Sequence, residues 1–268
     1  MAILVIGGDK RFEYLAEYLS KYQKTLRIAQ NNDFEVTINN DDIVVLPIPF
    51  SRDGITVNAG KNNLNLPLTE IISAKPCKIC GGLLSKNFCE TLKANNINYF
   101  DYYTDEVLTQ NNAMLTAQAA ISLAISELDT SLHGKKILIT GYGRIGKLLA
   151  KYLHSLNAEV TIAIRRNEVA AQIYTDGFKN IYIHELKHHI SNFELIFNTV
   201  PAQIFNRDII TCLNENTVYF ELASISGISN CFENNIRIVN GSGLPGRYFP
   251  KSAAEYIFNA LQPNINNI

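Results

Sequence analysis

The hexapeptide Gly141–Gly146 has the G-x-G-x-x-G spacing of a dinucleotide-binding turn. It directly follows Ile137–Thr140, which we expect to be a strand, and it opens Ile145–Leu156, which we expect to be a helix. A second apolar segment, Val160–Ile164, begins about 20 residues farther on, as in a βαβ unit. This context predicts a site for a nicotinamide dinucleotide. The alternative is a glycine-rich turn that has lost its ligand.

Each glycine of this turn has a physical role. Gly141 permits the tight turn, Gly143 lets the pyrophosphate approach the backbone, and Gly146 lets the helix pack closely on the strand. The phosphates would lie at the helix N-terminus, where unpaired N–H groups and the helix dipole favour an anion. The residues expected to bind the cofactor here are Gly141, Tyr142, Gly143, Arg144, Ile145 and Gly146.

The end of the second strand of the βαβ unit indicates which cofactor is bound. NAD-selective sites carry Asp or Glu there, to bond the ribose 2′-hydroxyl. This chain has Arg165 and Arg166 instead, and two guanidinium groups attract the 2′-phosphate of NADP. We therefore expect NADP, with NAD as the alternative. A solvated pair at a strand end would also explain the two arginines.

Two polar segments end later strands of the same unit, Asn198–Pro201 and Glu221–Ser224. Parallel sheets bind ligands beyond the carboxyl ends of their strands, so these loops should approach the nicotinamide half of the cofactor. Ordinary turn formation is the alternative. The residues expected to contribute are Thr199, Val200, Pro201, Ala223 and Ser224.

The first half of the chain has two segments that could contact a substrate. Gly7–Arg11 follows the first apolar segment, and Arg11 could hold a carboxylate by two parallel hydrogen bonds. Ser51–Gly54 follows another apolar segment in the same way. Together they predict an anionic substrate, although each segment could equally be a solvated turn.

Two motifs that bind metals in other proteins are discounted. His184–His188 matches H-E-x-x-H, but it follows a strand inside the dinucleotide-binding unit and lacks an evident third ligand. A solvated short helix explains it. Cys77 and Cys80 form a single C-x-x-C pair, and Cys80 lies in an expected strand, which favours packing. No metal site is expected.

Apolar segments alternate with helical ones along the chain, which indicates parallel sheets covered by helices. The long segment Asn111–Leu128 has little polar surface and is expected to be a helix buried between two domains. Expected strands are Ala2–Ile6, Ile43–Ile48, Lys78–Gly82, Ile137–Thr140, Val160–Ile164, Ile181–Ile183, Leu195–Asn198, Thr217–Leu222 and Ile236–Val239. Expected helices are Arg11–Gln23, Asn111–Leu128, Ile145–Leu156 and Ser252–Leu261. The six strands after residue 135 have the number of a complete doubly wound sheet.

The composition argues against several classes of protein. The chain has 268 residues, of which 47% are hydrophobic and 18% charged, with a formal net charge of −1. This balance gives no field that would attract nucleic acid or an anionic membrane. No apolar stretch approaches the length of a membrane span, about 18 residues. The five cysteines are an odd number in a long chain and favour a reducing cytoplasm over a disulfide scaffold.

Several motifs, in the same order and over nearly the whole chain, resemble the family of the A subunit of dipicolinate synthase from spore-forming bacteria. The Gly-Gly-Asp-x-Arg start and the Gly-Leu-Pro-Gly segment are more specific than the shared glycine-rich hexapeptide. The matching segments are Gly7–Arg11, Leu46–Pro49, Ser51–Gly54, Gly141–Gly146, Asn198–Pro201, Leu222–Ser224 and Gly243–Gly246.

The resemblance implies an α/β fold with two domains, like that of the D-2-hydroxyacid dehydrogenases. Residues 1–128 would form a flavodoxin-like substrate domain, and the C-terminal helix, 250–268, would pack back on it. Residues 129–249 would form the doubly wound Rossmann domain that binds NAD(P).

The resemblance also implies an activity, the NAD(P)-dependent oxidation of dihydrodipicolinate or its hydroxy-tetrahydro precursor to dipicolinate. The implied setting is the cytoplasm of the mother cell during sporulation. The flavoprotein-like B subunit of dipicolinate synthase is the implied partner, and a homo-oligomer is expected. Asp9 is the first choice of general base, because a closed cleft disfavours a charged carboxylate. Residues expected to hold or orient the dicarboxylate are Arg11, Ser51, Arg52, Asp53, Asn112, Thr116 and Lys251.

Three positions depart from the family pattern near the expected cleft, and they bear on the substrate. Gln118 and Glu221 stand where relatives have Glu and Asp, and Ile225 begins a segment that replaces Pro-Gly-Gly. One alternative is a dehydrogenase of another small acid, such as a 2-hydroxy acid, but no histidine lies beyond His189 to serve it. The other is a non-enzymatic protein that binds NADP as a sensor or scaffold.

Overall fold

The computed structural model describes residues 2–21, 26–29, 37–60, 63–228 and 236–265. The chain divides into two compact units, Met1–Asn112 with Pro245–Ile268, and Ala113–Leu244. The first division therefore falls within helix α4 (Glu106–Glu127), whereas the sequence places the boundary just after that helix. Each unit is an α/β fold built on a parallel sheet, as the sequence predicts.

The first unit contains a five-stranded sheet in the order β2-β1-β3-β4-β5. All of its neighbouring strands pair in parallel. This is the flavodoxin-like order, in which the chain starts near the middle of the sheet and reverses direction once. The strands are β1 (Ile3–Ile6), β2 (Leu26–Ala29), β3 (Ile43–Val45), β4 (Lys78–Gly81) and β5 (Asn98–Asp101).

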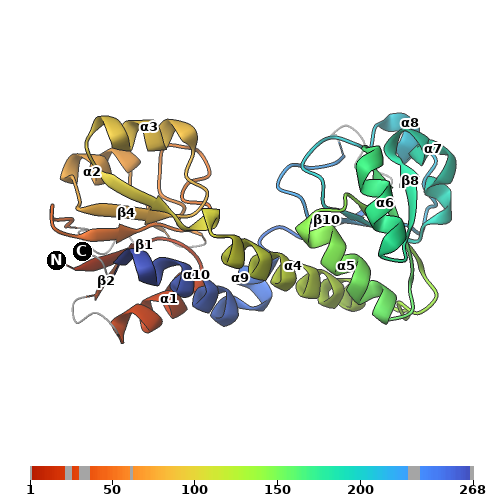
Figure 1. Cartoon of the computed structure of the whole chain (residues 1–268), viewed down its shortest axis with the longest axis horizontal. Coiled ribbons are helices and arrows are strands. Elements are labelled where there is room, and N and C mark those ends of the chain that lie inside the picture. The colour runs from red at the N-terminus through yellow and green to blue at the C-terminus, as the bar shows by residue number, and fades with distance from the viewer. Residues whose placement is uncertain (1, 22–25, 30–36, 61–62, 229–235, 266–268) are drawn as a thin grey trace. The chain divides into compact units, whose positions relative to one another are not determined.

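Helices cover both faces of this sheet (Figure 1). Ile3 and Val5 pack toward α1 (Lys10–Ser20) and α10 (Pro250–Ile265). The alternating residues Leu4 and Ile6 pack toward α2 (Leu68–Ala74) and α3 (Lys86–Ala94). Successive residues of a strand point to opposite faces, so a strand that is apolar throughout must be buried on both sides.

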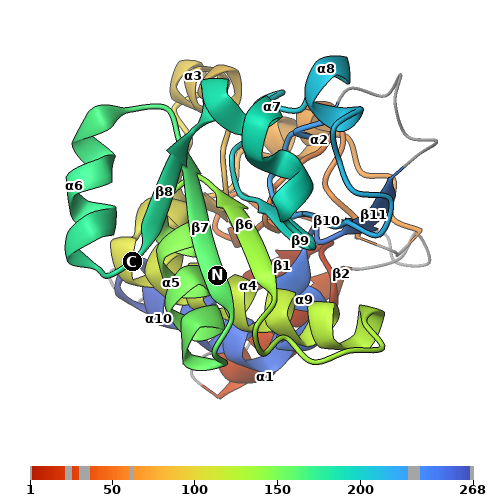
Figure 2. The same ribbon diagram turned by 90° about the vertical axis from the view of Figure 1, so that its right-hand side faces the viewer.

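The second unit contains a six-stranded parallel sheet in the order β11-β10-β9-β6-β7-β8 (Figure 2). Read from its own first strand, this is the 3-2-1-4-5-6 order of the Rossmann fold. The strands are β6 (Lys136–Thr140), β7 (Glu159–Ile164), β8 (Lys179–Tyr182), β9 (Leu195–Asn198), β10 (Val218–Glu221) and β11 (Arg237–Asn240). The chain reverses direction between β6 and β9, which is where such sheets bind dinucleotides.

The core of the second unit also lies on both sides of its sheet. Leu138 and Ile196 pack with Leu186 and Ile209 from the helical segments that follow β8 and β9. Ile139, which alternates with Leu138, is equally buried. The helical segments are α5 (Arg144–Ser155), α6 (Asn167–Thr175), η2 (Ile183–Glu185), α7 (Leu186–His189), η3 (Ile190–Asn192) and α8 (Arg207–Ile210).

Several element boundaries differ from the sequence prediction. Helix α1 ends at Ser20, and the expected end at Gln23 lies outside the described residues, as do Cys231 and the last residues of the expected segment 250–268. Strand β3 stops at Val45, before Pro47 and the cis Ile48–Pro49 peptide. Strands β2 and β5 were not expected.

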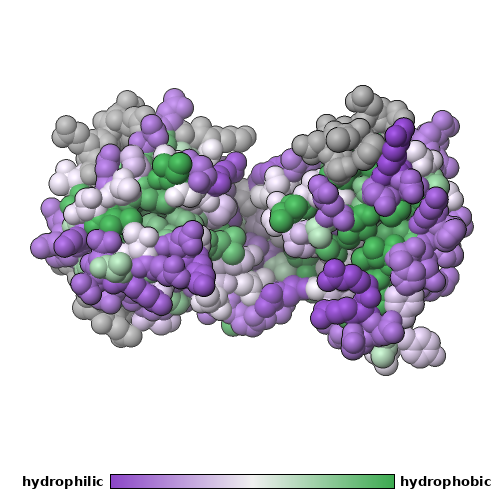
Figure 3. Space-filling view, turned by 90° about the horizontal axis from the view of Figure 1, so that it is seen from above, coloured by the Kyte–Doolittle hydropathy of each residue, from purple (hydrophilic) through white to green (hydrophobic). Residues whose placement is uncertain are grey.

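Hydrophilic side chains cover much of the face seen in Figure 3, with smaller hydrophobic areas between them. Exposed large apolar residues include Ile55, Val107, Tyr174 and Ile225. Among the residues that the structure describes, no helix has the length and apolar character needed to cross a bilayer.

Candidate functional site

The glycine-rich turn joins β6 to α5 with the geometry of a phosphate-binding turn. Gly141 has a φ of +85°, and a Cβ there would lie 2.7 Å from Val200 Cγ2. A Cβ on Gly146 would overlap the carbonyl oxygen of Gly141, so this glycine allows the close helix–strand contact. Gly143 is exposed, and no atom lies within 4 Å of the position that its Cβ would take. The turn thus leaves room beside Gly143 for a pyrophosphate.

The N-terminus of α5 is suited to an anion. Gly143 is the N-cap residue and provides no side-chain hydrogen bond to the first turn of the helix. The helix is twelve residues long, so its dipole adds to the attraction of its first N–H groups for a phosphate. Arg144 is exposed at the first helical position, and Ile145 is half-buried. These residues therefore fit the phosphates of a dinucleotide.

Tyr142 anchors the turn through its side chain. Its hydroxyl donates a 2.7 Å hydrogen bond to Asp176 Oδ2, and its ring meets Phe178 edge-on. Burial is the largest cause that raises the pKa of Tyr142 above its ordinary value, and the neighbouring carboxylate of Asp176 raises it further. Any contact of Tyr142 with the cofactor is therefore expected from its backbone.

Arg165 and Arg166 lie directly after β7, and both are exposed. Strand β7 pairs with β6, and the Gly141 N–H donates to the Ala163 carbonyl oxygen at 2.9 Å, so the end of β7 adjoins the glycine-rich turn. Within the described part of the chain, neither guanidinium makes a hydrogen bond or ion pair. This placement fits the predicted contact with a ribose 2′-phosphate.

The two later loops lie at the same edge of the sheet, because β9 pairs with β6 on one side and β10 on the other. The Thr199 hydroxyl donates to the Thr140 carbonyl oxygen at 2.6 Å, which holds this loop against the glycine-rich turn. Pro201 and Ser224 are exposed, while Val200 and Ala223 are half-buried. The sequence predicted these loops but not the hydrogen-bonding roles of the buried Asn198 and the half-buried Glu221.

In the first unit, Asp9 and Arg11 form a close pair after β1. Asp9 caps helix α1 by accepting from the Arg11 N–H at 3.1 Å. The Arg11 side chain binds the Asp9 carboxylate at two points, with Nε–Oδ1 at 2.8 Å and Nη2–Oδ2 at 2.9 Å. Nη2 also donates to the Ile48 carbonyl oxygen at 3.1 Å. The sequence predicts that Arg11 holds a substrate carboxylate in this way; in the structure, the carboxylate that it holds is that of Asp9.

The segment Ser51–Gly54 is organised by its own hydrogen bonds. Asp53 Oδ1 accepts from the Ile55 and Thr56 N–H groups at 2.8 Å each and from the Ser51 hydroxyl at 2.9 Å. The bonds from Thr56 and Ile55 lower the pKa of Asp53. Arg52 is exposed beside this turn. Ser51 and Asp53 therefore shape the turn, and Arg52 is the residue of the segment best placed to meet a ligand.

The remaining substrate candidates lie on helices. Asn112 Nδ2 donates to the Tyr103 hydroxyl at 3.3 Å, and Thr116 is buried one turn farther along α4. Lys251 is exposed in the first turn of α10. That these three contact the same ligand as Asp9 remains a prediction.

The discounted motifs have structural explanations. Cys80 is fully buried in the core, and burial raises the pKa of its thiol to about 12. In the H-E-x-x-H segment, Leu186 is buried in the core, and the His184 ring stacks on Tyr182 with centroids 5.5 Å apart. Across the residues described, no three His, Cys, Asp or Glu side chains come together as metal ligands would.

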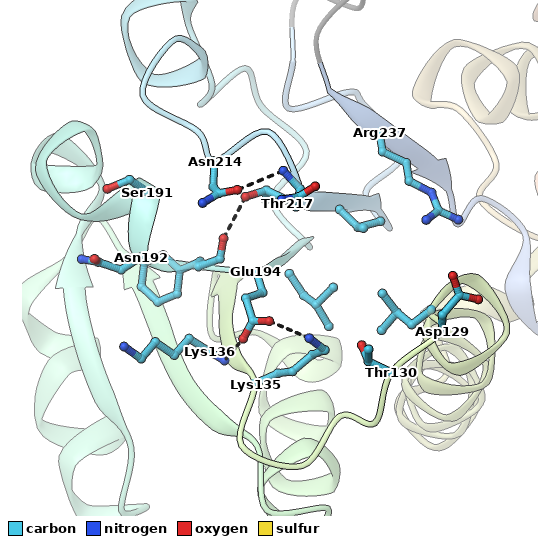
Figure 4. Close-up of a pocket in the computed structure, with 15 residues that line it drawn as sticks. Asp129, Thr130, Lys135, Lys136, Ser191, Asn192, Glu194, Asn214, Thr217 and Arg237 are labelled. Carbon is cyan, nitrogen blue, oxygen red and sulfur yellow. Dashed lines mark hydrogen bonds and ion pairs between the residues drawn. The ribbon is translucent and has the colours of Figure 1, made fainter.

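A cavity of about 640 Å³ lies at the amino ends of β6, β9 and β10 (Figure 4). The glycine-rich turn follows the carboxyl end of β6, at the opposite edge of the sheet. Lys135 Nζ pairs with Glu194 Oε2 at 2.6 Å, and Arg237 Nη2 pairs with Glu127 Oε2 at 2.9 Å. Open parallel sheets bind ligands at their carboxyl ends, so this cavity is not where the cofactor is expected.

Comparison with known families matches two segments of the chain. Residues 2–103 match the N-terminal domain of the A subunit of dipicolinate synthase. Residues 122–225 match the shikimate/quinate 5-dehydrogenase family. The first match covers most of the N-terminal part of the flavodoxin-like unit, and the second covers most of the Rossmann unit.

Comparison with individual proteins extends the likeness along the whole chain. The A subunit of dipicolinate synthase from Bacillus subtilis (strain 168) is 24% identical, over 97% of this chain and 94% of that protein. The crystal structure of the corresponding protein from Bacillus halodurans has a TM-score of 0.86 at 22% identity, covering 100% of this chain and 98% of the other. The NAD-dependent formate dehydrogenase of Staphylococcus aureus, solved in complex with NAD, has a TM-score of 0.60 at 14% identity, covering 99% of this chain and 95% of that one.

These comparisons confirm the resemblance to the A subunit of dipicolinate synthase and the α/β fold with a Rossmann unit. They also support an NAD(P)-dependent oxidoreductase.

Proposed function

We propose that the chain oxidises dihydrodipicolinate, or its hydroxy-tetrahydro precursor, to dipicolinate with NADP. The observation that carries this proposal is the likeness to the A subunit of dipicolinate synthase, which extends along 97% of the chain. The open glycine-rich turn at Gly143 and the exposed Arg165–Arg166 pair support NADP as the cofactor.

The proposed reaction balances with one cofactor. Dihydrodipicolinate and NADP⁺ give dipicolinate, NADPH and a proton: the hydride leaves a ring carbon for the nicotinamide C4, and the proton leaves as the ring becomes aromatic. The hydroxy-tetrahydro precursor gives the same products and one water, which it loses from its hydroxyl-bearing carbon. Aromatisation supplies the driving force, so the protein mainly has to position the reactants and exclude water. NADP supplies the hydride acceptor, and the protein groups bind and orient both molecules.

Of the groups proposed to bind the substrate, all but Thr116 belong to the first unit. Arg52 and Lys251 are exposed cations that could pair with the two carboxylates. Asp9 remains the proposed proton acceptor, and Arg11 holds its carboxylate at two points. Asn112 and Thr116 are proposed to orient the ring.

A charge-removing variant tests the substrate assignment. Arg52→Gln is expected to raise KM for the dicarboxylate about tenfold, because one charge-assisted hydrogen bond is lost, and to leave NADP affinity unchanged. Arg11→Gln is expected to raise KM as well, but it also disrupts the Asp9 pair. Wild-type kinetics in the Arg52 variant would remove that residue from the site.

The turnover of the purified chain tests the proposed reaction. The substrate is made in situ by its synthase, and NADPH absorbance is followed together with dipicolinate itself. Formation of both products in equal amounts is expected. If the chain binds NADP but gives no product even when the B subunit is present, the reaction as proposed is wrong, and the sensor or another small acid becomes the better account.

The proposed setting rests on the resemblance to the A subunit of dipicolinate synthase. We propose that the chain acts with the B subunit of dipicolinate synthase, as a homo-oligomer, in the cytoplasm of the mother cell during sporulation. Co-purification of the two proteins from sporulating cells, and light scattering on the purified chain, would test the partner and the oligomeric state.

A further inference from the structure

Three strand ends beside the glycine-rich turn carry a continuous polar network. Thr140 on β6 pairs in register with Asn198 on β9, and Asn198 pairs with Glu221 on β10. Thr140 and Asn198 are both fully buried. A buried polar side chain is costly unless its hydrogen bonds are made, so the partners of these residues show what the network does.

Asn198 uses both ends of its amide. Oδ1 accepts from the Thr140 hydroxyl at 2.5 Å and from the Val200 N–H at 3.2 Å. Nδ2 donates to the Val200 carbonyl oxygen at 3.1 Å and to Glu221 Oε1 at 2.7 Å. Asn198 therefore fixes the start of the loop that follows β9 and links it to the residue that precedes Gly141.

Glu221 continues the network to the next loop. Oε1 also accepts from the Ala223 N–H at 3.1 Å, while Oε2 accepts from the Tyr219 hydroxyl at 3.0 Å and the Gly227 N–H at 2.7 Å. One carboxylate thus receives four hydrogen bonds. It closes the loop 223–227 at both of its ends.

Gly227 is fitted to this arrangement. A Cβ at Gly227 would lie 2.5 Å from the Tyr219 hydroxyl and 2.6 Å from Asn198 Nδ2, so a larger residue would displace the network. The side chains that hold the two loops therefore leave no space between them. Since every described donor reaches an acceptor, the network is expected to be rigid.

We propose that Asn198 and Glu221 are positioning residues that fix the loops 199–201 and 223–227 to receive the nicotinamide half of the cofactor. The adenine half is bound separately, by the glycine-rich turn and Arg165. This inference rests on the proposed NADP site. Asn198 is buried and Glu221 is half-buried, so we expect both to act on the cofactor through the loops that they hold.

The experiment compares two ligands by calorimetry, NADP⁺ and 2′,5′-ADP, which lacks the nicotinamide half. Glu221→Gln replaces one carboxylate oxygen by an N–H donor, which then faces the donors of Gly227 and Tyr219 or those of Asn198 and Ala223. The variant is expected to bind NADP⁺ about tenfold more weakly, the loss typical of one hydrogen bond to a charged group. Its affinity for 2′,5′-ADP is expected to stay at the wild-type value.

Two further variants serve as a control and as a test of compensation. Glu215→Gln is the matched control, because Glu215 is exposed in the same unit, and it should change neither affinity. The double variant Asn198→Asp with Glu221→Gln moves the carboxylate from β10 to β9 and restores one charged and one amide partner. It should recover part of the NADP⁺ affinity that Glu221→Gln loses.

The outcomes separate this inference from the proposed function. If the wild type binds neither ligand, the NADP site itself is wrong. If the wild type binds both, and Glu221→Gln weakens both equally or neither, the positioning role is overturned. Weak binding of both ligands together with a lowered melting temperature would mean that the network only stabilises the fold, which also contradicts the proposal.

Discussion

Gly143 and Gly146 belong to one motif, but their surroundings differ. Gly143 faces open space, whereas Gly146 lies against the Gly141 carbonyl. Gly143→Ala should therefore leave the melting temperature unchanged and weaken NADP⁺ about tenfold or more, because the methyl group occupies the phosphate position. Gly146→Ala should lower the melting temperature. Thermal denaturation and calorimetry on both variants check this, and equal behaviour of the two variants would contradict it.

The 2′-phosphate assignment is tested by reversing a charge. Arg165→Asp should weaken NADP⁺ by about tenfold or more, the value of a charge-assisted bond, and should leave NAD⁺ affinity unchanged or improved. Arg207, an exposed arginine on α8, provides the control Arg207→Asp. The measurement is the dissociation constant of each cofactor, and an equal loss for both would remove Arg165 from the 2′-phosphate.

At the scale of single residues, the sequence predicts the role of a residue better than it predicts which other residue it contacts. The roles of Gly141 and Gly146 could be predicted, because a fixed spacing in a βαβ unit imposes them. The Asp9–Arg11 pair could not, since a two-residue separation does not show whether an arginine faces its neighbour or a ligand. The contact between Asn198 and Glu221 could not be predicted either, because only the strand register shows that these two strand ends are neighbours.

Among the elements, α1 and α10 show how distant segments stabilise one unit. Phe12, Leu15 and Leu19 of α1 pack in one core with Ile257 and Leu261 of α10. The apolar spacing predicted both helices. It could not identify their partner, which only the family resemblance implied.

Leu261 tests this packing because its side chain is fully buried. Leu261→Ala should lower the free energy of unfolding by about 2–5 kcal/mol, the usual range for a buried leucine. Asn259→Ala, an exposed change on the same helix, should cost far less. Urea unfolding of the two variants checks the difference, and a similar small effect in both would contradict the packing of α10 in this core.

The sequence does not predict strands β2 and β5, because the apolar pattern of both is weak. Strand β5 reads Asn-Tyr-Phe-Asp and is only half-buried, because it lies at the edge of the sheet. Strand β2, at the other edge, includes Arg27 in its four residues. The end of β3 was placed too late because Leu46 and Ile48 remain buried after the ladder stops.

The Lys135–Glu194 pair gives a pH dependence to the amino end of the second sheet. The hydrogen bond from Lys135 lowers the pKa of Glu194, despite partial burial. The stabilisation is therefore present above the ordinary pKa of Glu and is lost as pH falls through the lowered value. Because half of the Glu194 side chain is exposed, the contribution should be below about 1 kcal/mol.

Lys135→Met tests this sign. At neutral pH the variant should be less stable than the wild type. In acid the difference should shrink, because Glu194 becomes protonated as pH falls through its lowered pKa. Lys187→Met, at an exposed position of the same unit, is the control. Urea titrations at the two pH values provide the measurement, and a difference that grows in acid would contradict the account.

At the scale of the whole molecule, the two units have different sheet orders and different expected roles, one in binding the substrate and the other in binding the cofactor. The flavodoxin-like unit carries the candidate substrate residues Asp9 and Arg52, and the Rossmann unit carries the cofactor turn. Motif order along the chain predicted this arrangement of folds. The position of the first division could not be read from the sequence, because α4 is one uninterrupted helix that contributes residues to both units.

The most direct test of the proposed function follows the hydride itself. Dihydrodipicolinate deuterated at its saturated ring carbons is incubated with the purified chain and NADP⁺, and the reduced cofactor is examined by mass spectrometry. Our account predicts NADPH carrying one deuterium from the ring, formed together with dipicolinate. Dipicolinate formed without labelled NADPH, or no reduced cofactor from a chain shown to bind NADP⁺, would contradict it.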